Sequence, residues 1–198
     1  GWRAVIADTF TFGNVRLVSQ AVANWVNANH TGGEQPEVVI GYDTRFLSDR
    51  FAAETARVLA GNGIIVWLTR TDAPTPAISY NVKRKGAAAG VVITASHNPP
   101  RYNGFKVKSA NGGSASSKQC AAIERELVSI DGEHQVHLMD YDDAVEREII
   151  RRFDPAWLYY EHLMTMVDVD RISEGEMGVV ADAMWGSGRG AFNSILSR

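Results

Sequence analysis

The chain of 198 residues is 45% hydrophobic and 22% charged, which is the composition of an ordinary globular protein of one or two domains and not of a disordered tail. Its formal net charge of -3 gives no overall electrostatic reason to bind nucleic acid or an anionic membrane, so neither partner is predicted. Because Cys120 is the single cysteine, an internal disulfide is excluded. No apolar run reaches the roughly 18 residues needed to span a bilayer. Since no secretory signal pattern is seen either, a cytoplasmic location is expected.

The first part of the chain predicts a helix, a strand and a second helix. Apolar residues recur at helical spacing between Val15 and Val26, and Thr11 precedes them as a candidate N-cap. The apolar run "EVVIGY", residues 37–42, is typical of a strand. The stripe that follows predicts a helix that stops at Gly61-Asn62-Gly63.

The same alternation continues over residues 64–95. "IIVWLT" predicts a strand, "TPAISYNVKRKG" a short helix opened by Pro76, and "AAGVVITA" a third strand. Continuous apolar strands that alternate with helices indicate a sheet covered on both faces, with right-handed crossovers. The predicted fold class is therefore α/β, with a mixed, mainly parallel sheet in a three-layer α/β/α arrangement. Functional loops of such sheets lie at the carboxyl ends of the strands.

The second half of the chain is predicted in three parts. "GFKVK", residues 104–108, indicates a short strand open to antiparallel pairing, and residues 116–130 a helix that closes a first domain over 1–138. The pattern from Ala144 to Val167 is helical with a break at Asp154-Pro155, so residues 139–175 are expected to form a helical connection. Residues 176–198 predict a strand, a glycine-rich turn and the start of a helix, as in the truncated start of a second α/β domain.

The stretch "TASHNPPRYNGFK", which follows the third predicted strand, holds the side chains best suited to chemistry. Ser96 becomes a nucleophile only if a neighbour removes its proton or polarises its acceptor, and His97 adjoins it. Lys106, beyond a turn at Asn103-Gly104, can fold back toward the same pocket. An arbitrary Ser-His pair is more often a turn cap beside a polar loop residue, but the many loop-fixing residues here favour a functional site. A serine hydrolase is not supported, because the G-x-S-x-G elbow is missing.

Four stretches carry a resemblance to one family. "TASHNPPRYNGFKV" closely resembles the phosphoserine loop of the α-D-phosphohexomutase superfamily, the phosphoglucomutases and phosphomannomutases. "GWRAVIADTFTFGNV" resembles the segment after the family's N-terminal Gly-Thr-rich turn, "GYDTRFLSD" its early arginine-bearing loop, and "VVADAMWGSGRGAF" the start of its second domain. The resemblance covers nearly the whole chain, but only the first domain and the opening of the second in a four-domain family.

The resemblance implies roles for individual residues. It makes Ser96 the carrier of a phosphoryl group that is exchanged with a hexose phosphate through a bisphosphate, so that the net reaction is an isomerisation. It makes Lys106 the general base or acid, His97 a polar group at the sugar, and Arg3 a cationic contact near the phosphoserine. From the residues alone, Arg3 is equally open to being a surface or stacking residue.

Asn98 and Arg45 are the remaining candidates for binding substrate or phosphate, although Arg45 in "DTR" is as readily explained by a loop salt bridge. The resemblance also implies Mg²⁺, held by the phosphate on Ser96 and by a D-x-D-x-D loop that this sequence lacks. One phosphoserine offers too few ligands for an octahedral cation, so the chain alone is expected to bind metal weakly or not at all. The hexose phosphate can be that of glucose, mannose or glucosamine.

Two hypotheses follow from these observations. In the first, the chain is an N-terminal fragment of a phosphohexomutase, inactive by itself, whose true start lies upstream of Gly1 and whose C-terminal stretch self-associates or is open to proteases. In the second, it is a non-catalytic α/β binding or interaction module derived from that family.

Overall fold

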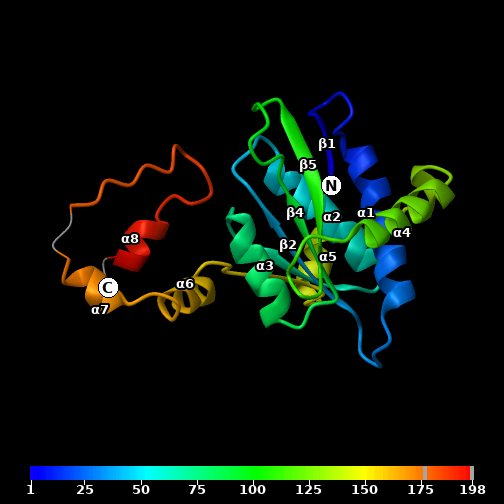
Figure 1. Ribbon diagram of the computed structural model, residues 1–198. Coiled ribbons are helices and arrows are strands. Elements are labelled where there is room, and N and C mark those ends of the chain that lie inside the picture. Colours follow the sequence, from blue (N-terminus) through cyan, green and yellow to red (C-terminus); the bar gives the residue numbers. More distant parts are fainter. Residues whose placement is uncertain (176–177, 197–198) are drawn as a thin grey trace.

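The computed structural model describes residues 1–175 and 178–196, and within them one mixed sheet forms the centre of the fold (Figure 1). The strands lie in the order β1-β5-β4-β2-β3-β6. Their bounds are Trp2–Val5 for β1, Glu37–Tyr42 for β2, Ile65–Thr69 for β3, Ala89–Ile93 for β4, Tyr102–Ser109 for β5 and Ile150–Phe153 for β6. β2, β3, β4 and β6 run parallel, whereas β5 is antiparallel to both β4 and β1. The predicted mixed, mainly parallel sheet is confirmed.

Helices cover both faces of this sheet. The α-helices of the described residues are Phe12–Asn29 (α1), Ser48–Gly61 (α2), Thr75–Arg84 (α3), Ser117–Ser129 (α4), Tyr141–Glu146 (α5), Trp157–Met164 (α6), Val169–Ser173 (α7) and Ala191–Leu196 (α8), of which α7 and α8 lie away from the sheet (Figure 1). α1, α2, α4 and α5 lie together on one face, and α3 lies on the other with α6 beside it (Figure 1). In the described part of the chain, no helix is long and apolar enough to cross a membrane.

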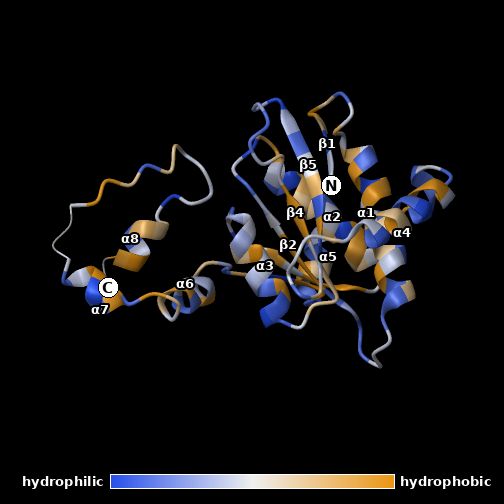
Figure 2. Ribbon diagram, viewed as in Figure 1, coloured by the Kyte–Doolittle hydropathy of each residue, from blue (hydrophilic) through white to orange (hydrophobic). Residues whose placement is uncertain are grey.

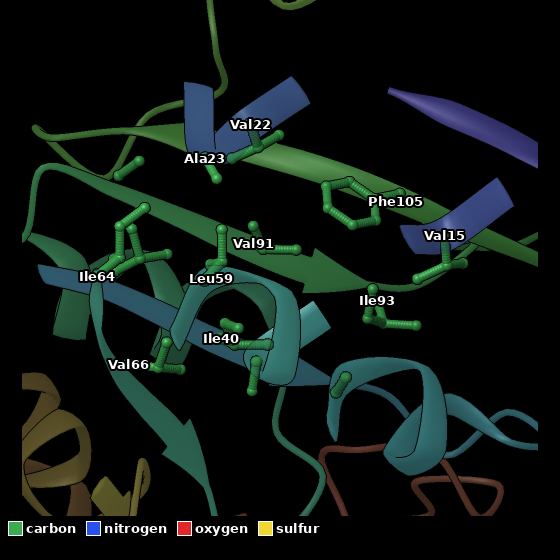
Figure 3. Packing of buried hydrophobic residues seen from close by; sticks show 14 of the residues in the cluster. Val15, Val22, Ala23, Ile40, Leu59, Ile64, Val66, Val91, Ile93 and Phe105 are labelled. Atoms are coloured by element: carbon green, nitrogen blue, oxygen red, sulfur yellow. The ribbon is translucent and has the colours of Figure 1, made fainter. Parts of the chain in front are cut away.

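The main core lies between the sheet and the α1 and α2 helices. Val91 and Ile93 of β4 and Phe105 of β5 point from the sheet toward Val22 and Leu59 of these helices (Figure 3). Their neighbours along the strands face the opposite way, because successive side chains of a strand alternate between its two faces. Burying one such aliphatic side chain contributes about 1.5–3 kcal/mol relative to leaving it exposed. Figure 2 shows the resulting pattern, with apolar strands at the centre and polar residues on the outer helix faces.

The local signals for individual elements are confirmed. The backbone N–H of Asn14 donates to Thr11 Oγ1 at 3.2 Å, so Thr11 caps α1 as predicted. β5 is antiparallel and longer than the expected 104–108. Ser116 and Gln119 form a reciprocal capping box at the start of α4.

The expected helix from Ala144 onward is wrong for residues 150–153, which form β6. α5 ends at Glu146, and Glu148, in the turn that follows, has a left-handed φ of 55°. The backbone N–H of Val66 then donates to the carbonyl of Ile149 at 2.8 Å, and the chain continues parallel to β3. A free edge of β3 offers unpaired backbone groups, and pairing with it outweighs the local helical pattern. No element was predicted at residues 2–5, where the structure has β1.

The C-terminal stretch follows the prediction in part. The expected strand begins at Glu176 and Met177, which lie outside the described residues. Residues 178–183 form no strand, since no neighbouring strand in the described part of the chain pairs with them. The glycine-rich turn and the following helix, α8, are present as predicted.

Candidate active site

The loop that bears Ser96 leaves the carboxyl end of β4 as a compact turn. The N–H of Ser96 donates to Thr94 Oγ1 at 3.0 Å, the N–H of Asn98 to the carbonyl of Ala95 at 3.1 Å, and the N–H of Tyr102 to the carbonyl of Pro99 at 3.0 Å. β2 lies next to β4 in parallel, so the loop after β2 ends at the same edge of the sheet. This is the edge at which α/β sheets bind ligands.

Ser96 is exposed and has a strained backbone. Its φ of 59° is left-handed, which is uncommon for a residue with a side chain. Its Oγ lies 3.5 Å from Nδ1 of His97, which is also exposed. Within the described residues no carboxylate hydrogen-bonds to His97, so the acid of a Ser-His-acid relay is missing there. The exposed hydroxyl is thus available to a ligand without belonging to a hydrolase triad.

Arg45 joins the loop after β2 to the loop of Ser96. Its Nη2 donates to the carbonyls of Ser96 at 2.8 Å and Asn98 at 2.6 Å. Its Nη1 donates to the carbonyls of Pro99 and Tyr102, both at 2.9 Å. Its Nε lies 3.2 Å from Oδ2 of Asp43. The structure therefore brings Arg45 to the serine loop, with its guanidinium directed at backbone oxygens.

Asn98 lies in the same turn, but its side chain has an open acceptor. Its Oδ1 is buried and has no hydrogen-bond partner among the described residues. A buried acceptor without a donor costs about 1–3 kcal/mol. Asn98 is therefore a candidate to accept a hydrogen bond that the described residues do not supply.

Lys106 and Arg3 lie on neighbouring strands and on one face of the sheet. Lys106 of β5 is paired with Val92, and Arg3 of β1 is paired with Gly104, two residues before Lys106 on the same face. Burial is the main cause that lowers the pKa of Lys106, and the positive charges of Arg3 and Lys108 lower it further. A lysine so placed gives up its proton more readily than a solvated one. No hydrogen bond in the described part of the chain joins Lys106 to Ser96.

A cavity of about 570 Å³ opens beside Ser96. It is lined by residues of the loops after β2, β3 and β4 and of the C-terminal stretch, namely Asp43, Thr44, Arg45, Phe46, Ala73, Pro74, Thr75, Thr94, Ser96, Asn98, Pro100, Met184, Gly186 and Ser187. Sequence reasoning selected Arg45, Ser96 and Asn98 from this set. It missed Thr44 and Thr75, although the position of both after parallel strands was a signal that could have found them.

The described residues do not fit a magnesium ion by themselves. No group of three His, Cys, Asp or Glu side chains among them is placed to hold a metal. Asp43, the carboxylate in the cavity, is already occupied: its Oδ1 accepts from the N–H of Arg45 and from Ser48 Oγ, and its Oδ2 pairs with Arg45. Mg²⁺ needs near-octahedral oxygen ligands, which this arrangement does not provide.

The family described as phosphoglucomutase/phosphomannomutase, alpha/beta/alpha domain I, matches residues 1–133. The chain belongs to the phosphoglucomutase/phosphomannomutase family. The matched range includes Ser96, Lys106 and every other residue selected for the site from the sequence.

Individual relatives agree with this membership. A phosphoglucomutase of Staphylococcus epidermidis is 32% identical over 98% of this chain and 36% of its own length. A Haemophilus influenzae protein assigned as a phosphomannomutase is 42% identical over 54% of this chain and 23% of its own. A crystal structure of a Thermus thermophilus protein assigned as a phosphomannomutase superposes with a TM-score of 0.87 at 33% identity, over 100% of this chain and 41% of its own. The chain thus spans less than half of each of these proteins.

Proposed function

We propose that this chain is the phosphoryl-carrying part of a phosphohexomutase, an intramolecular phosphotransferase, and that Ser96 is the residue that carries the phosphoryl group. The observation that supports this most is the position of Ser96, exposed and left-handed at the carboxyl end of β4 inside the family's first domain. A hexose phosphate bound in the adjoining cavity would place a hydroxyl next to this serine. Which hexose is used, that of glucose, mannose or glucosamine phosphate, is left open.

The proposed step exchanges one bond to phosphorus for another. The sugar hydroxyl oxygen forms a bond to phosphorus while the bond from phosphorus to Ser96 Oγ breaks. The departing Ser96 Oγ takes up a proton from solvent, so the products are a sugar bisphosphate and a serine hydroxyl. Neutral Lys106 accepts the hydroxyl proton, and the lowered pKa of its ammonium supports this role. The reverse step, at the other phosphate of the reoriented bisphosphate, restores phosphoserine and yields the isomer. Arg3 and His97 are proposed to contact the phosphoryl group and the sugar.

Magnesium is proposed only for the whole protein, where ligands beyond a phosphorylated Ser96 would come from residues that this chain does not contain. Its chemistry would be to neutralise charge on the transferring phosphoryl group. The cytoplasm is the proposed location. The alternative of a non-catalytic module derived from the family predicts that Ser96 is never phosphorylated.

The test uses the whole protein that contains this chain. The protein is incubated with a hexose 1,6-bisphosphate and Mg²⁺, and the intact mass and the phosphorylated residue are determined. We expect one phosphate on Ser96 and none in Ser96→Ala. A phosphate elsewhere, or a Ser96→Ala turnover within about tenfold of the parent, a barrier change of about 1.4 kcal/mol, would contradict an obligatory phosphoserine.

The 198-residue chain alone is proposed to fold but not to convert glucose 1-phosphate, because phosphoryl transfer depends on positioning and charge stabilisation by parts that the chain lacks. A cooperative melt without turnover is expected. The chain is also proposed to self-associate through its apolar C-terminal stretch, where Val180, Met184 and Trp185 are exposed.

A further inference from the structure

The hydrogen-bonding capacity of Arg45 is fully used within the chain. A guanidinium has five N–H donors. Four of them match the four carbonyl contacts of Nη1 and Nη2 with the serine loop, and the fifth, on Nε, faces the carboxylate of Asp43. No donor is left for a phosphate. The side chain is also shielded, since only 13% of it is exposed.

The carboxylate of Asp43, which pairs with Arg45, is itself held by hydrogen bonds. Asp43 Oδ1 accepts from the backbone N–H of Arg45 at 3.0 Å and from Ser48 Oγ at 2.9 Å. Ser48 Oγ in turn accepts from Asn103 Nδ2 at 2.9 Å. Ser48 begins α2 and Asn103 lies in β5, so the guanidinium is held by two elements of the fold. A group held in this way can fix the loop that it contacts.

The contacts of Arg45 span the loop from one end to the other. They begin at the carbonyl of Ser96 and end at the carbonyl of Tyr102, where β5 starts. Ser96 itself has a left-handed backbone, a conformation that is strained for a residue with a side chain and persists only where the surroundings enforce it. The bond to its carbonyl is one of the interactions that act directly on this conformation.

We propose that Arg45 is a positioning residue, which holds residues 96–102 so that Ser96 Oγ faces the cavity, and that it is not a ligand of the substrate phosphate. The proposal rests on the proposed role of Ser96. It predicts that loss of the guanidinium loosens the loop and lowers the rate at which the serine is phosphorylated, whereas the affinity for the bisphosphate changes little. A misplacement of about 1 Å at a reacting group can cost about 100-fold in rate.

The test compares Arg45→Ala with Arg57→Ala in the whole protein. Arg57 is a matched control, because it also donates to a backbone carbonyl, that of Met139, and to a carboxylate, that of Glu54, but it does not contact the serine loop. Three quantities are measured: amide hydrogen exchange at Asn98 and Tyr102, the rate of Ser96 phosphorylation by a hexose 1,6-bisphosphate as a function of its concentration, and the melting temperature.

For Arg45→Ala we expect faster exchange at both amides, a maximal phosphorylation rate about 100-fold lower, and partial recovery of the rate with guanidinium at concentrations far below denaturing. Arg45→Lys should not restore the phosphorylation rate, because an ammonium cannot donate hydrogen bonds to four carbonyls at once. Arg57→Ala should lower the melting temperature without changing the exchange or the rate. If Arg45→Ala does not fold, the exchange and rate of Arg45→Lys decide the matter.

Unchanged amide hydrogen exchange in the Arg45 variants would overturn the proposal. A lowered phosphorylation rate that returns to the parent value at high bisphosphate concentration would also overturn it, because loss of a phosphate ligand has that effect. Failure of the proposed function would look different. In that case the parent itself would carry no phosphate on Ser96, while the exchange at Asn98 and Tyr102 would still report whether Arg45 holds the loop.

Discussion

Nη2 of Arg45 lies 2.8 Å from the carbonyl oxygen of Ser96, although 51 positions separate the two residues in the chain. The contact exists because β2 and β4 are parallel neighbours and the loops that follow them meet at one edge of the sheet. The site is therefore assembled by strand order, and its loop conformation can be tested independently of its chemistry.

Replacing Ser96 by glycine should relieve the left-handed backbone of this residue. Glycine adopts a positive φ without a steric penalty, whereas alanine keeps the strain, and both variants lack the hydroxyl. We expect Ser96→Gly to be more stable than Ser96→Ala by about 0.5–1 kcal/mol in denaturant unfolding, after the greater chain entropy of glycine is subtracted. Equal stability of the two variants would show that Ser96 is not strained in solution.

Lys106→Met should leave the stability of the protein unchanged or raise it at neutral pH. Since the folded-state pKa of Lys106 is lowered, the folded protein binds fewer protons than the unfolded chain between that pKa and the ordinary value, and its stability rises with pH through this range. At neutral pH the desolvated ammonium disfavours folding, so methionine should leave the melting temperature unchanged or higher. The alkaline rise in stability should shrink.

The same variant should slow phosphoryl transfer about 100-fold or more in the whole protein, because it removes the proton acceptor. The pH profile of turnover is the measurement, with Lys118→Met, on the exposed start of α4, as the control. A parent-like rate and pH profile would exclude Lys106 as the base.

Gly104 is required by the close approach of three strands. A Cβ at this position would lie 2.6 Å from the carbonyl oxygen of Thr94 and 2.8 Å from that of Trp2, and neither backbone can move freely within the sheet. Gly104→Ala should cost about 1–3 kcal/mol of unfolding free energy. Gly33→Ala, with nothing within 4 Å, should change it by less than about 0.5 kcal/mol. Similar unfolding midpoints for the two variants would contradict this packing.

Glu54 of α2 is a largely buried carboxylate that links this helix to α1. It pairs with Arg16 of α1 and Arg57 of α2, and its side chain is only 9% exposed. Glu54→Gln removes the carboxylate charge shared by the two guanidinium groups, of which Arg16 keeps its ion pair with Glu133, and should cost about 2 kcal/mol. Asp143→Asn, which breaks an exposed pair with Arg147, should cost less than about 1 kcal/mol. A smaller loss for the Glu54 variant would mean that water compensates the pair.

Several features of the chain follow from local sequence alone. Apolar runs bounded by turn residues predicted β2, β3 and β4, and the hydroxyl of Thr11 just before a helical stripe predicted the start of α1. These signals are reliable because they depend on backbone preferences and side-chain periodicity within a few residues. The loop of Ser96 was found in the same way, since its proline and glycine residues directly follow a buried strand.

Other features were decided only by tertiary structure. Residues 150–153 carry a helical pattern, yet they became β6 because β3 offered an open edge to pair with. The sequence did not decide whether Arg45 binds substrate or forms a structural salt bridge. The fold directs its guanidinium to four carbonyls more than fifty residues away. The pKa of Lys106 likewise depends on burial and on Arg3, which lies on another strand. Each of these three features depends on distances between residues that are remote in sequence. The order of the strands sets those distances, and sequence periodicity and residue spacing do not contain them.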